Sequence, residues 1–420
     1  MNHAVLSHVG MRRATNQDSY GVHLAESQAG WDRHGHFFLV ADGMGAHAAG
    51  ELASKLASQL VPHNYLRQRD LPPAEGLHKA IVETNAEIYR RGQANIEFRS
   101  MGTTCSVLTL LPEGAVVAHV GDSRVYQTNG NKLYQLTFDH SLVWEMQAAG
   151  EVTDETARSG VIPKNVITRS LGPNANVQVD IEGPFPIRKG NCFLLCSDGL
   201  SGQVSDEEIG AILNTLPPEE ACQLFVDLSN LRGGPDNITA VVVAVADDRI
   251  GSTKQDSIIV RHSSSPRTFS PALAVVSGVC LLAAVVLVFM QFYPWAIVST
   301  VLGLIALLTG LSQYLRPNTS TVLPESRYGN GPYRQFPAEC SQPFFEHLAG
   351  IMKSLREAAE EKNWEVGWDE INRQFKQACE KGDKGDWTSA VGIQSRIIIS
   401  LMDQIRSQRS PNASDSSVDL

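Results

Sequence analysis

Features that would point to several common functions are missing from this sequence. The seven cysteines contain no CxxC pair and no metal-finger spacing, and an odd, scattered set is typical of a reducing compartment rather than of a disulfide framework. Excess positive charge is missing too, and the formal net charge of −10 argues against a nucleic-acid partner. The N-terminal stretch MNHAVLSHVGMRR has no apolar core of signal-peptide length, so we expect the first domain to stay in the cytosol.

The strongest change in composition lies at 271–315. PALAVVSGVCLLAAVVLVFMQFY (271–293) carries no charge, and at about 1.5 Å per residue it is long enough for a hydrocarbon core of about 30 Å. A second uncharged run follows Pro294, and arginines flank the pair on both outer sides. This pattern predicts a transmembrane helical hairpin at 271–315 that contacts the lipid bilayer, with the N- and C-terminal domains both cytoplasmic. A buried core hairpin outside membranes is the alternative.

Residues 1–248 have the pattern of one mixed domain. Short apolar runs such as HFFLVA (36–41) and ITAVVVAVA (238–246) are rich in β-branched or aromatic residues and predict strands. AAGELASKLASQLVPHNYL, in contrast, has apolar residues three and four apart, which predicts a helix. Strands dominate, so we predict the α+β class, with sheets covered by helices.

The rest of the chain is predicted to contain two linkers and a bundle. The polar stretches 249–270 and 316–338 have the composition of linkers. Amphipathic spacing over 339–408 predicts a cytosolic bundle of about three helices. The last residues, 409–420, are too polar to fold and are predicted to be disordered. Because the bundle has no catalytic signature, we expect it to bind a protein partner that the sequence does not identify.

Acidic residues stand at the ends of several predicted strands. Asp42, Asp122 and Asp198 each follow an apolar run, Asp236 precedes one, and Asp18 lies in RRATNQDSYG. If these carboxylates converge, their charges repel one another unless a divalent cation compensates them. Oxygen ligands without cysteine favour Mg²⁺ or Mn²⁺ over zinc. A glycine after the aspartate, as in VADGMG, lets a backbone carbonyl reach the ion. A single Asp-Gly pair is more often a plain turn, so the prediction of a metal site depends on the whole set.

Short blocks in a fixed order extend this interpretation. They are HVGMRRATNQD, VADGMGAHAAGE, MGTTC, HVGDSRVY, LTFDHSLV, NVITRSLG, LLCSDGL and GGPDNITAVVV. In this order, over residues 3–246, they resemble the metal-dependent protein phosphatases of type 2C, above all the bacterial serine/threonine branch. The resemblance implies a four-layer α-β-β-α sandwich, with two antiparallel sheets face to face and helices outside. Taken together with the predicted hairpin, the resemblance to the bacterial branch leads us to expect a multi-pass protein of the bacterial inner (cytoplasmic) membrane.

The resemblance further assigns roles to individual positions. The ligands that it implies for two Mn²⁺ or Mg²⁺ ions, and for a third, weaker one, are Asp42, the carbonyl of Gly43, Asp198, Asp236 and Asp122. Asp42 corresponds to the carboxylate that bridges both ions. Arg13 corresponds to the arginine that binds phosphate through its planar guanidinium, and Asp18 to an acid that orients metal-bound water. His47 is the nearest candidate for the acid that protonates the leaving alkoxide; metal-bound water is the alternative acid, and a histidine at a helix start needs no catalytic role.

The implied function is that of a membrane-anchored serine/threonine phosphoprotein phosphatase. A water or hydroxide bridging the metals would attack the phosphorus of phosphoserine or phosphothreonine in line, without a phospho-enzyme. Its partners would be phosphorylated proteins, among them a serine/threonine kinase of the same bacterium. Gln17 stands where many members have Glu, and a neutral amide binds a hard cation less strongly. The alternative function is therefore a catalytically weak, membrane-tethered sensor or scaffold that binds phosphoproteins.

Overall fold

The computed structural model describes residues 1–45, 49–153, 156, 162–163, 166–247, 271–315 and 328–408, with side chains between 271 and 315 described for 277–304 only. The chain forms two compact units, one made of Met1–Arg261 with Ser326–Leu420 and the other of His262–Glu325. His47, the predicted linker 249–270, residues 316–327 of the second linker and the tail 409–420 lie outside the described residues.

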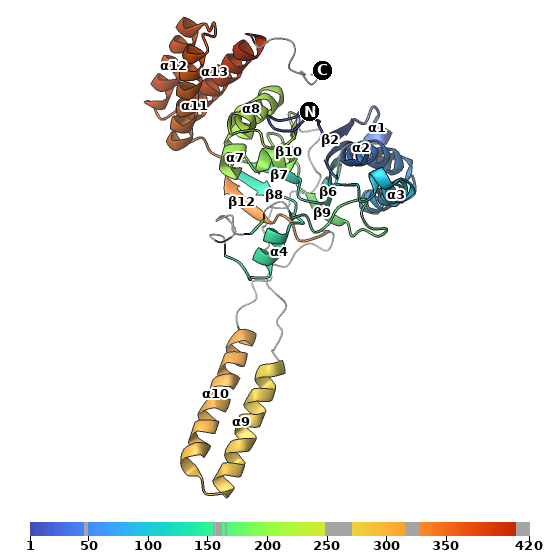
Figure 1. The fold of residues 1–420 in the computed structure, drawn as a ribbon, viewed down its shortest axis with the longest axis vertical. Helices are drawn as coiled ribbons and strands as arrows, with labels where there is room; N and C mark the ends of the chain where they lie inside the picture. Colours follow the sequence, from blue (N-terminus) through green and yellow to red (C-terminus); the bar gives the residue numbers. More distant parts are fainter. Residues whose placement is uncertain are drawn as a thin grey trace. The chain divides into compact units, whose positions relative to one another are not determined.

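Two antiparallel sheets form the centre of the larger unit (Figure 1). The first sheet has the strand order β1 (Asn2–His8), β11 (Ile238–Ala244), β10 (Cys192–Cys196), β7 (Arg124–Asn129), β8 (Lys132–Gln135) and β12 (Arg334–Pro337). The second has the order β2 (Asp18–His23), β3 (His36–Met44), β5 (Cys105–Leu111), β6 (Gly114–Val120) and β9 (Asp180–Phe185), with β4 (Gly102–Thr103) beside β3.

Both faces of the central strands are covered, which explains why the sequences of these strands are continuous apolar runs. Along β3, Phe37 and Leu39 pack in the cluster that contains helix residues, whereas Phe38 and Val40 pack in the cluster between the two sheets. Successive strand side chains point to opposite faces, so a strand that is covered on both faces needs apolar residues at every position. The unbroken run HFFLVA is thus the signature of a buried layer.

Helices cover the outer face of each sheet. The pair α2 (Ala49–Arg67) and α3 (Pro73–Ala94) packs on the second sheet, and α7 (Asp206–Thr215) with α8 (Pro218–Leu231) packs on the first (Figure 1). The shorter helices are α1 (Gln28–His34), η1 (Ile96–Phe98), α4 (Leu142–Ala148) and α6 (Asp198–Ser201). The predicted α+β sandwich of two antiparallel sheets with helices outside is therefore confirmed.

The chain returns to this sandwich after residue 327. β12, which lies inside the stretch predicted as a linker, pairs with β8 at the edge of the first sheet. It is followed by α11 (Gln342–Glu361), α12 (Trp368–Gly382) and α13 (Trp387–Gln408). Apolar residues of these helices share one buried cluster with α7 and α8, including Phe345, Val391 and Ile398. The prediction that these helices bind a separate protein is not supported, because the sandwich of the same chain covers these apolar side chains.

The smaller unit contains α9 (Pro271–Phe289) and α10 (Tyr293–Leu315). Their described parts are joined by hydrogen bonds, since Ser277 Oγ donates to the Gly303 carbonyl at 3.1 Å and Ser299 Oγ to the Cys280 carbonyl at 2.7 Å.

The prediction of a bilayer-spanning hairpin at 271–315, and with it the inner-membrane location, is wrong. Within the described part of the chain, no helix combines the length and the apolar character needed to cross a membrane.

Candidate functional site

The predicted acidic residues lie where strands begin and end in the two sheets. Asp18 opens β2 and pairs in register with Asp42 near the end of β3. Asp198 follows β10, Asp236 precedes the antiparallel β11, and Asp122 stands between β6 and β7. In antiparallel neighbours the end of one strand lies beside the start of the next, so this topology can gather distant carboxylates at one edge. We call these residues, Asp18, Asp42, Asp122, Asp198 and Asp236, the carboxylate cluster.

The backbone at Asp42 and Gly43 is held from several sides. The Asp42 N–H donates to Thr104 Oγ1 at 2.8 Å, and Thr103 Oγ1 donates to the Asp42 carbonyl at 2.9 Å. The Gly43 N–H donates to the Gln17 carbonyl at 3.1 Å. A Cβ at Gly43 would lie 2.2 Å from the Gly50 carbonyl oxygen, closer than real Cβ contacts come. Only glycine therefore fits directly after Asp42.

Asp18 is fixed by hydroxyl donors from the opposite sheet. Ser197 Oγ and Thr239 Oγ1 each donate to Asp18 Oδ2 at 2.7 Å. The other oxygen, Oδ1, is buried and has no hydrogen-bond partner among the described residues. Burial is the largest cause of a pKa raised to about 7, and the neighbouring charges of Asp198 and Asp236 raise it further. Asp18 thus has one oxygen that accepts two hydrogen bonds and one buried oxygen that can bind a proton or a cation.

Three other members of the cluster also have raised pKa values. Burial raises the pKa of Asp42 well above its ordinary value, and the charges of Asp18, Asp198, Asp122 and Asp236 raise it further. Burial, followed by the charge of Asp198, raises the pKa of Asp122 to about 8. Burial and the charge of Asp236 likewise raise the pKa of Asp198. These carboxylates lie close enough to resist ionising together, which is the condition that a bound cation relieves.

The donor set fits a divalent cation in chemistry. Oδ1 of Asp122 and Oδ1 of Asp198 are buried without a hydrogen-bond partner among the described residues, as is Oδ1 of Asp18. Carboxylate and carbonyl oxygens are the ligands that Mn²⁺ and Mg²⁺ prefer. In the described ranges no three His, Cys, Asp or Glu side chains stand in a grouping that could hold an ion by itself. The raised pKa values reflect repulsion between carboxylate charges, which acts over longer distances than the bonds between an ion and its ligands. Raised pKa values and the lack of such a grouping are therefore compatible.

Arg13 lies at the rim of the cluster. Its Nη2 donates to Asp236 Oδ2 at 2.7 Å, and its side chain is 49% exposed, so the guanidinium faces solvent while one edge is held. The hydrogen bond that Arg13 donates to Asp236 is the largest cause of a raised Arg13 pKa, and the charges of Asp42 and Asp198 add to it. Asn237 fixes the loop that carries Arg13: its Nδ2 donates to the carbonyls of Val9 and Thr15.

Sequence reasoning selected the acids and missed the neutral residues that orient them. Thr104, Ser197, Asn237 and Thr239 all hydrogen-bond to Asp18, to Asp42 or to the Arg13 loop. Each stands inside a recognised block, namely MGTTC, LLCSDGL or GGPDNITAVVV. The signal was therefore present, since a hydroxyl or amide beside a buried carboxylate is a candidate hydrogen-bond partner.

Comparisons with known proteins agree with this geometry. Residues 10–230 match a family model described as protein phosphatase 2C. The chain is 35% identical over 260 residues to protein phosphatase PhpP of Streptococcus pneumoniae serotype 2, a match that covers 59% of this chain and 99% of the relative. It is 38% identical over 210 residues to the serine/threonine phosphatase stp of Listeria monocytogenes serotype 4b, covering 49% of this chain and 82% of the relative.

A solved structure gives the same picture. The catalytic domain of the serine threonine protein phosphatase PstP, in complex with 2 manganese ions, has a TM-score of 0.50 and 31% sequence identity to this chain. The match covers 59% of this chain and 98% of that one.

Proposed function

The chain belongs to the protein phosphatase 2C family and is a metal-dependent serine/threonine protein phosphatase, and from this premise we propose that it hydrolyses phosphoserine and phosphothreonine in proteins at the carboxylate cluster. The observation that carries the proposal is a set of carboxylates from separate strands, three of which have a buried Oδ1 without a hydrogen-bond partner among the described residues, together with the exposed Arg13 that is paired with one of them. Without a bound cation, a cluster of carboxylates of this kind would destabilise the fold, because their like charges would be uncompensated.

The family uses a dinuclear Mn²⁺ or Mg²⁺ centre. For this chain we assign the ions to Asp42, the Gly43 carbonyl, Asp198 and Asp236, with Asp122 able to hold a third. When bound, such ions lower the pKa of water toward neutrality and neutralise charge on a phosphoryl group. The support in this chain is the buried Oδ1 atoms that find no hydrogen-bond partner among the described residues.

The chain's own groups supply orientation. Arg13 presents a planar fork of N–H donors, which can bind two phosphate oxygens while Nη2 stays on Asp236. Asp18 is held by Ser197 and Thr239 through Oδ2, and its buried Oδ1, which has no hydrogen-bond partner among the described residues, can accept a hydrogen bond from water.

Asp42→Asn gives the sharpest test. The substitution keeps the size of the side chain and removes one buried charge, so we expect the metal-free protein to be at least as stable as the wild type. Hydrolysis of a phosphothreonine peptide with Mn²⁺ should fall at least 100-fold, because the central ligand is lost. The matched control is Asp70→Ala, an exposed aspartate outside the cluster, which should leave turnover unchanged. Undiminished turnover in Asp42→Asn would remove the carboxylate cluster from the mechanism.

Three remaining predictions concern the alternative function, the substrate and the general acid. A catalytically weak sensor or scaffold is not favoured, since the relatives are named as phosphatases and the acids of the set are all present. A serine/threonine kinase as substrate remains a proposal by family analogy. The role of His47 as a general acid also stays a prediction, because that residue is outside the described part of the chain.

A further inference from the structure

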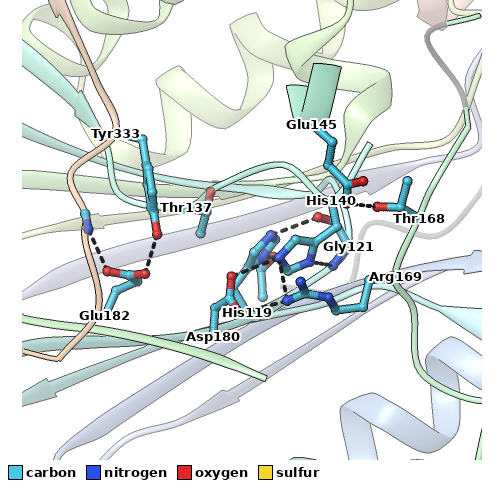
Figure 2. A network of polar contacts seen from close by, with 12 residues as sticks. His119, Gly121, Thr137, His140, Glu145, Thr168, Arg169, Asp180, Glu182 and Tyr333 are labelled. Atoms are coloured by element: carbon cyan, nitrogen blue, oxygen red, sulfur yellow. Dashed lines mark hydrogen bonds and ion pairs between the residues drawn. The ribbon is translucent and has the colours of Figure 1, made fainter. Parts of the chain in front are cut away.

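The segment that follows residue 327 closes over the edge of the second sheet. We call residues 328–337 the return segment. Tyr328 and Gly183 of β9 exchange backbone hydrogen bonds, with the Gly183 N–H donating at 3.2 Å. The Gly331 N–H donates to Glu182 Oε2 at 2.7 Å, and the Tyr333 hydroxyl donates to Glu182 Oε1 at 2.6 Å (Figure 2). Both carboxylate oxygens of a buried residue in β9 are therefore satisfied by the return segment.

The same segment also contacts α4. The Arg334 guanidinium carbon lies 3.9 Å from the centroid of the Trp144 ring, and Arg334 Nη2 donates to Gln147 Oε1 at 3.2 Å. The Tyr333 ring lies edge-on to Phe138, with centroids 5.4 Å apart, and Phe138 lies edge-on to Trp144 at 5.1 Å. Tyr333 and Arg334 thus pack on both Phe138 and the first turns of α4.

Phe138 belongs to a loop that precedes α4 and is hydrogen-bonded to Gly121. We call residues 137–141 the clamp loop. The His140 N–H donates to the Gly121 carbonyl at 2.7 Å, and the Gly121 N–H donates to His140 Nδ1 at 2.9 Å (Figure 2). Because Nδ1 accepts, the proton is on Nε2, which donates to Asp180 Oδ2 at 2.9 Å. These reciprocal bonds fix the backbone directly before Asp122.

β9 connects the two sides of this arrangement. Asp180 and Glu182 stand two residues apart on the strand, so their side chains share a face. Asp180 receives a second hydrogen bond, from Arg169 Nη1 at 2.8 Å, which keeps its carboxylate oriented toward His140 (Figure 2). The return segment therefore holds Glu182 and the clamp loop together, and His140 bridges them to Gly121.

We propose that Tyr333 and Arg334 are positioning residues for Asp122, acting through the clamp loop and β9. The family model ends at residue 230, so the return segment belongs to a part of the chain that the family match does not include. Rigid support of a ligand raises its affinity for a metal because less freedom is lost when the ion binds. The inference rests on the proposed function in treating Asp122 as the ligand of the weakest ion.

The experiment compares Tyr333→Phe/Arg334→Met with the wild type in the full chain. These substitutions keep the ring and the aliphatic stem but remove the bond to Glu182 and the cation over Trp144. Hydrogen exchange of the peptide containing Gly121 should be several-fold faster, and the weakest Mn²⁺ site, measured by calorimetric titration without substrate, should bind 3- to 10-fold less tightly. Gln335→Ala is the matched control, an exposed residue of the same strand, and should change neither quantity.

The outcomes separate this inference from the proposed function. Unchanged exchange at Gly121 overturns the proposal that Tyr333 and Arg334 support the clamp loop. Faster exchange with unchanged Mn²⁺ binding overturns the proposed effect of that support on Asp122. A wild-type protein that fails to hydrolyse phosphopeptides overturns the proposed function while leaving the exchange result valid. Should exchange increase along the whole chain, each single substitution is measured instead, and the same outcomes decide.

Discussion

Replacing Arg406 by methionine should destabilise the protein in a way that depends on pH. Arg406 of α13 forms an ion pair with Asp227 of α8, whose side chain is fully buried. Burial is the largest cause of an Asp227 pKa raised from 3.8 to about 6, and the charge of Arg406 opposes that rise. Methionine keeps much of the arginine stem and removes the charge, leaving a buried carboxylate without its cation.

The size of the effect follows from the pKa of Asp227. Without Arg406 the carboxyl is expected to remain protonated in the folded state up to high pH. The extra penalty relative to the wild type is then the free energy of protonating a group with a pKa of about 6. That penalty is close to zero at pH 5 and grows by about 1.4 kcal/mol for each pH unit above 6. We therefore expect a loss of about 3 kcal/mol at pH 8, in line with other broken buried pairs.

Urea unfolding of the full chain at pH 5 and pH 8 provides the measurement. Arg396→Met is the matched control, because Arg396 pairs with Glu220 at the same interface but is 52% exposed. An exposed pair of this kind contributes about 0–1 kcal/mol. Adding Asp227→Asn to Arg406→Met should restore most of the stability at pH 8. An equal loss at both pH values would show that packing, and not the buried charge, causes the effect.

Three other outcomes are expected. Gly43→Ala should abolish turnover and lower the thermal midpoint, because the new Cβ would lie 2.2 Å from the Gly50 carbonyl oxygen; wild-type turnover in this variant would contradict the geometry of the turn. Glu182→Gln should flatten the dependence of stability on pH. Burial, the largest cause, raises the pKa of Glu182 from 4.5 to about 7, so its contribution is present below pH 4.5 and is lost as the pH rises through 7; urea midpoints across this window would test it. Chelation of divalent ions should stop hydrolysis and lower the thermal midpoint, since it leaves the carboxylate cluster uncompensated; an unchanged midpoint would count against ion binding there.

The acids of the site could be predicted because their surroundings repeat along the chain. Asp42 and Asp198 each follow an apolar run and precede a glycine, so the end of a buried strand was visible in the sequence. Their hydrogen-bond partners could not be predicted, because Ser197 and Thr239 reach Asp18 across sequence separations of 179 and 221 residues. Only the pairing of β10 with β11 brings the two hydroxyls to one carboxylate oxygen.

The C-terminal part shows the opposite balance. Amphipathic spacing predicted helices over 339–408, and α11, α12 and α13 are found there. The spacing could not say which surface would cover their apolar faces, and the sandwich itself does so. The apolar run at 271–315 predicted a membrane hairpin, and this prediction is wrong, since no helix among the described residues is both long and apolar enough to cross a membrane.

The sequence by itself determined local properties: which stretches are strands or helices, and where strands end in acids. These depend on side-chain periodicity and backbone sterics, which act between residues close together in the chain. The tertiary structure alone decided which distant groups meet, as with Arg406 on Asp227 and Tyr333 on Glu182. Such pairs depend on the order of strands in the sheets and on how helices pack against them. The free energy of that packing comes from burying large apolar surfaces, so it cannot be read from the sequence around the few residues that form the pair.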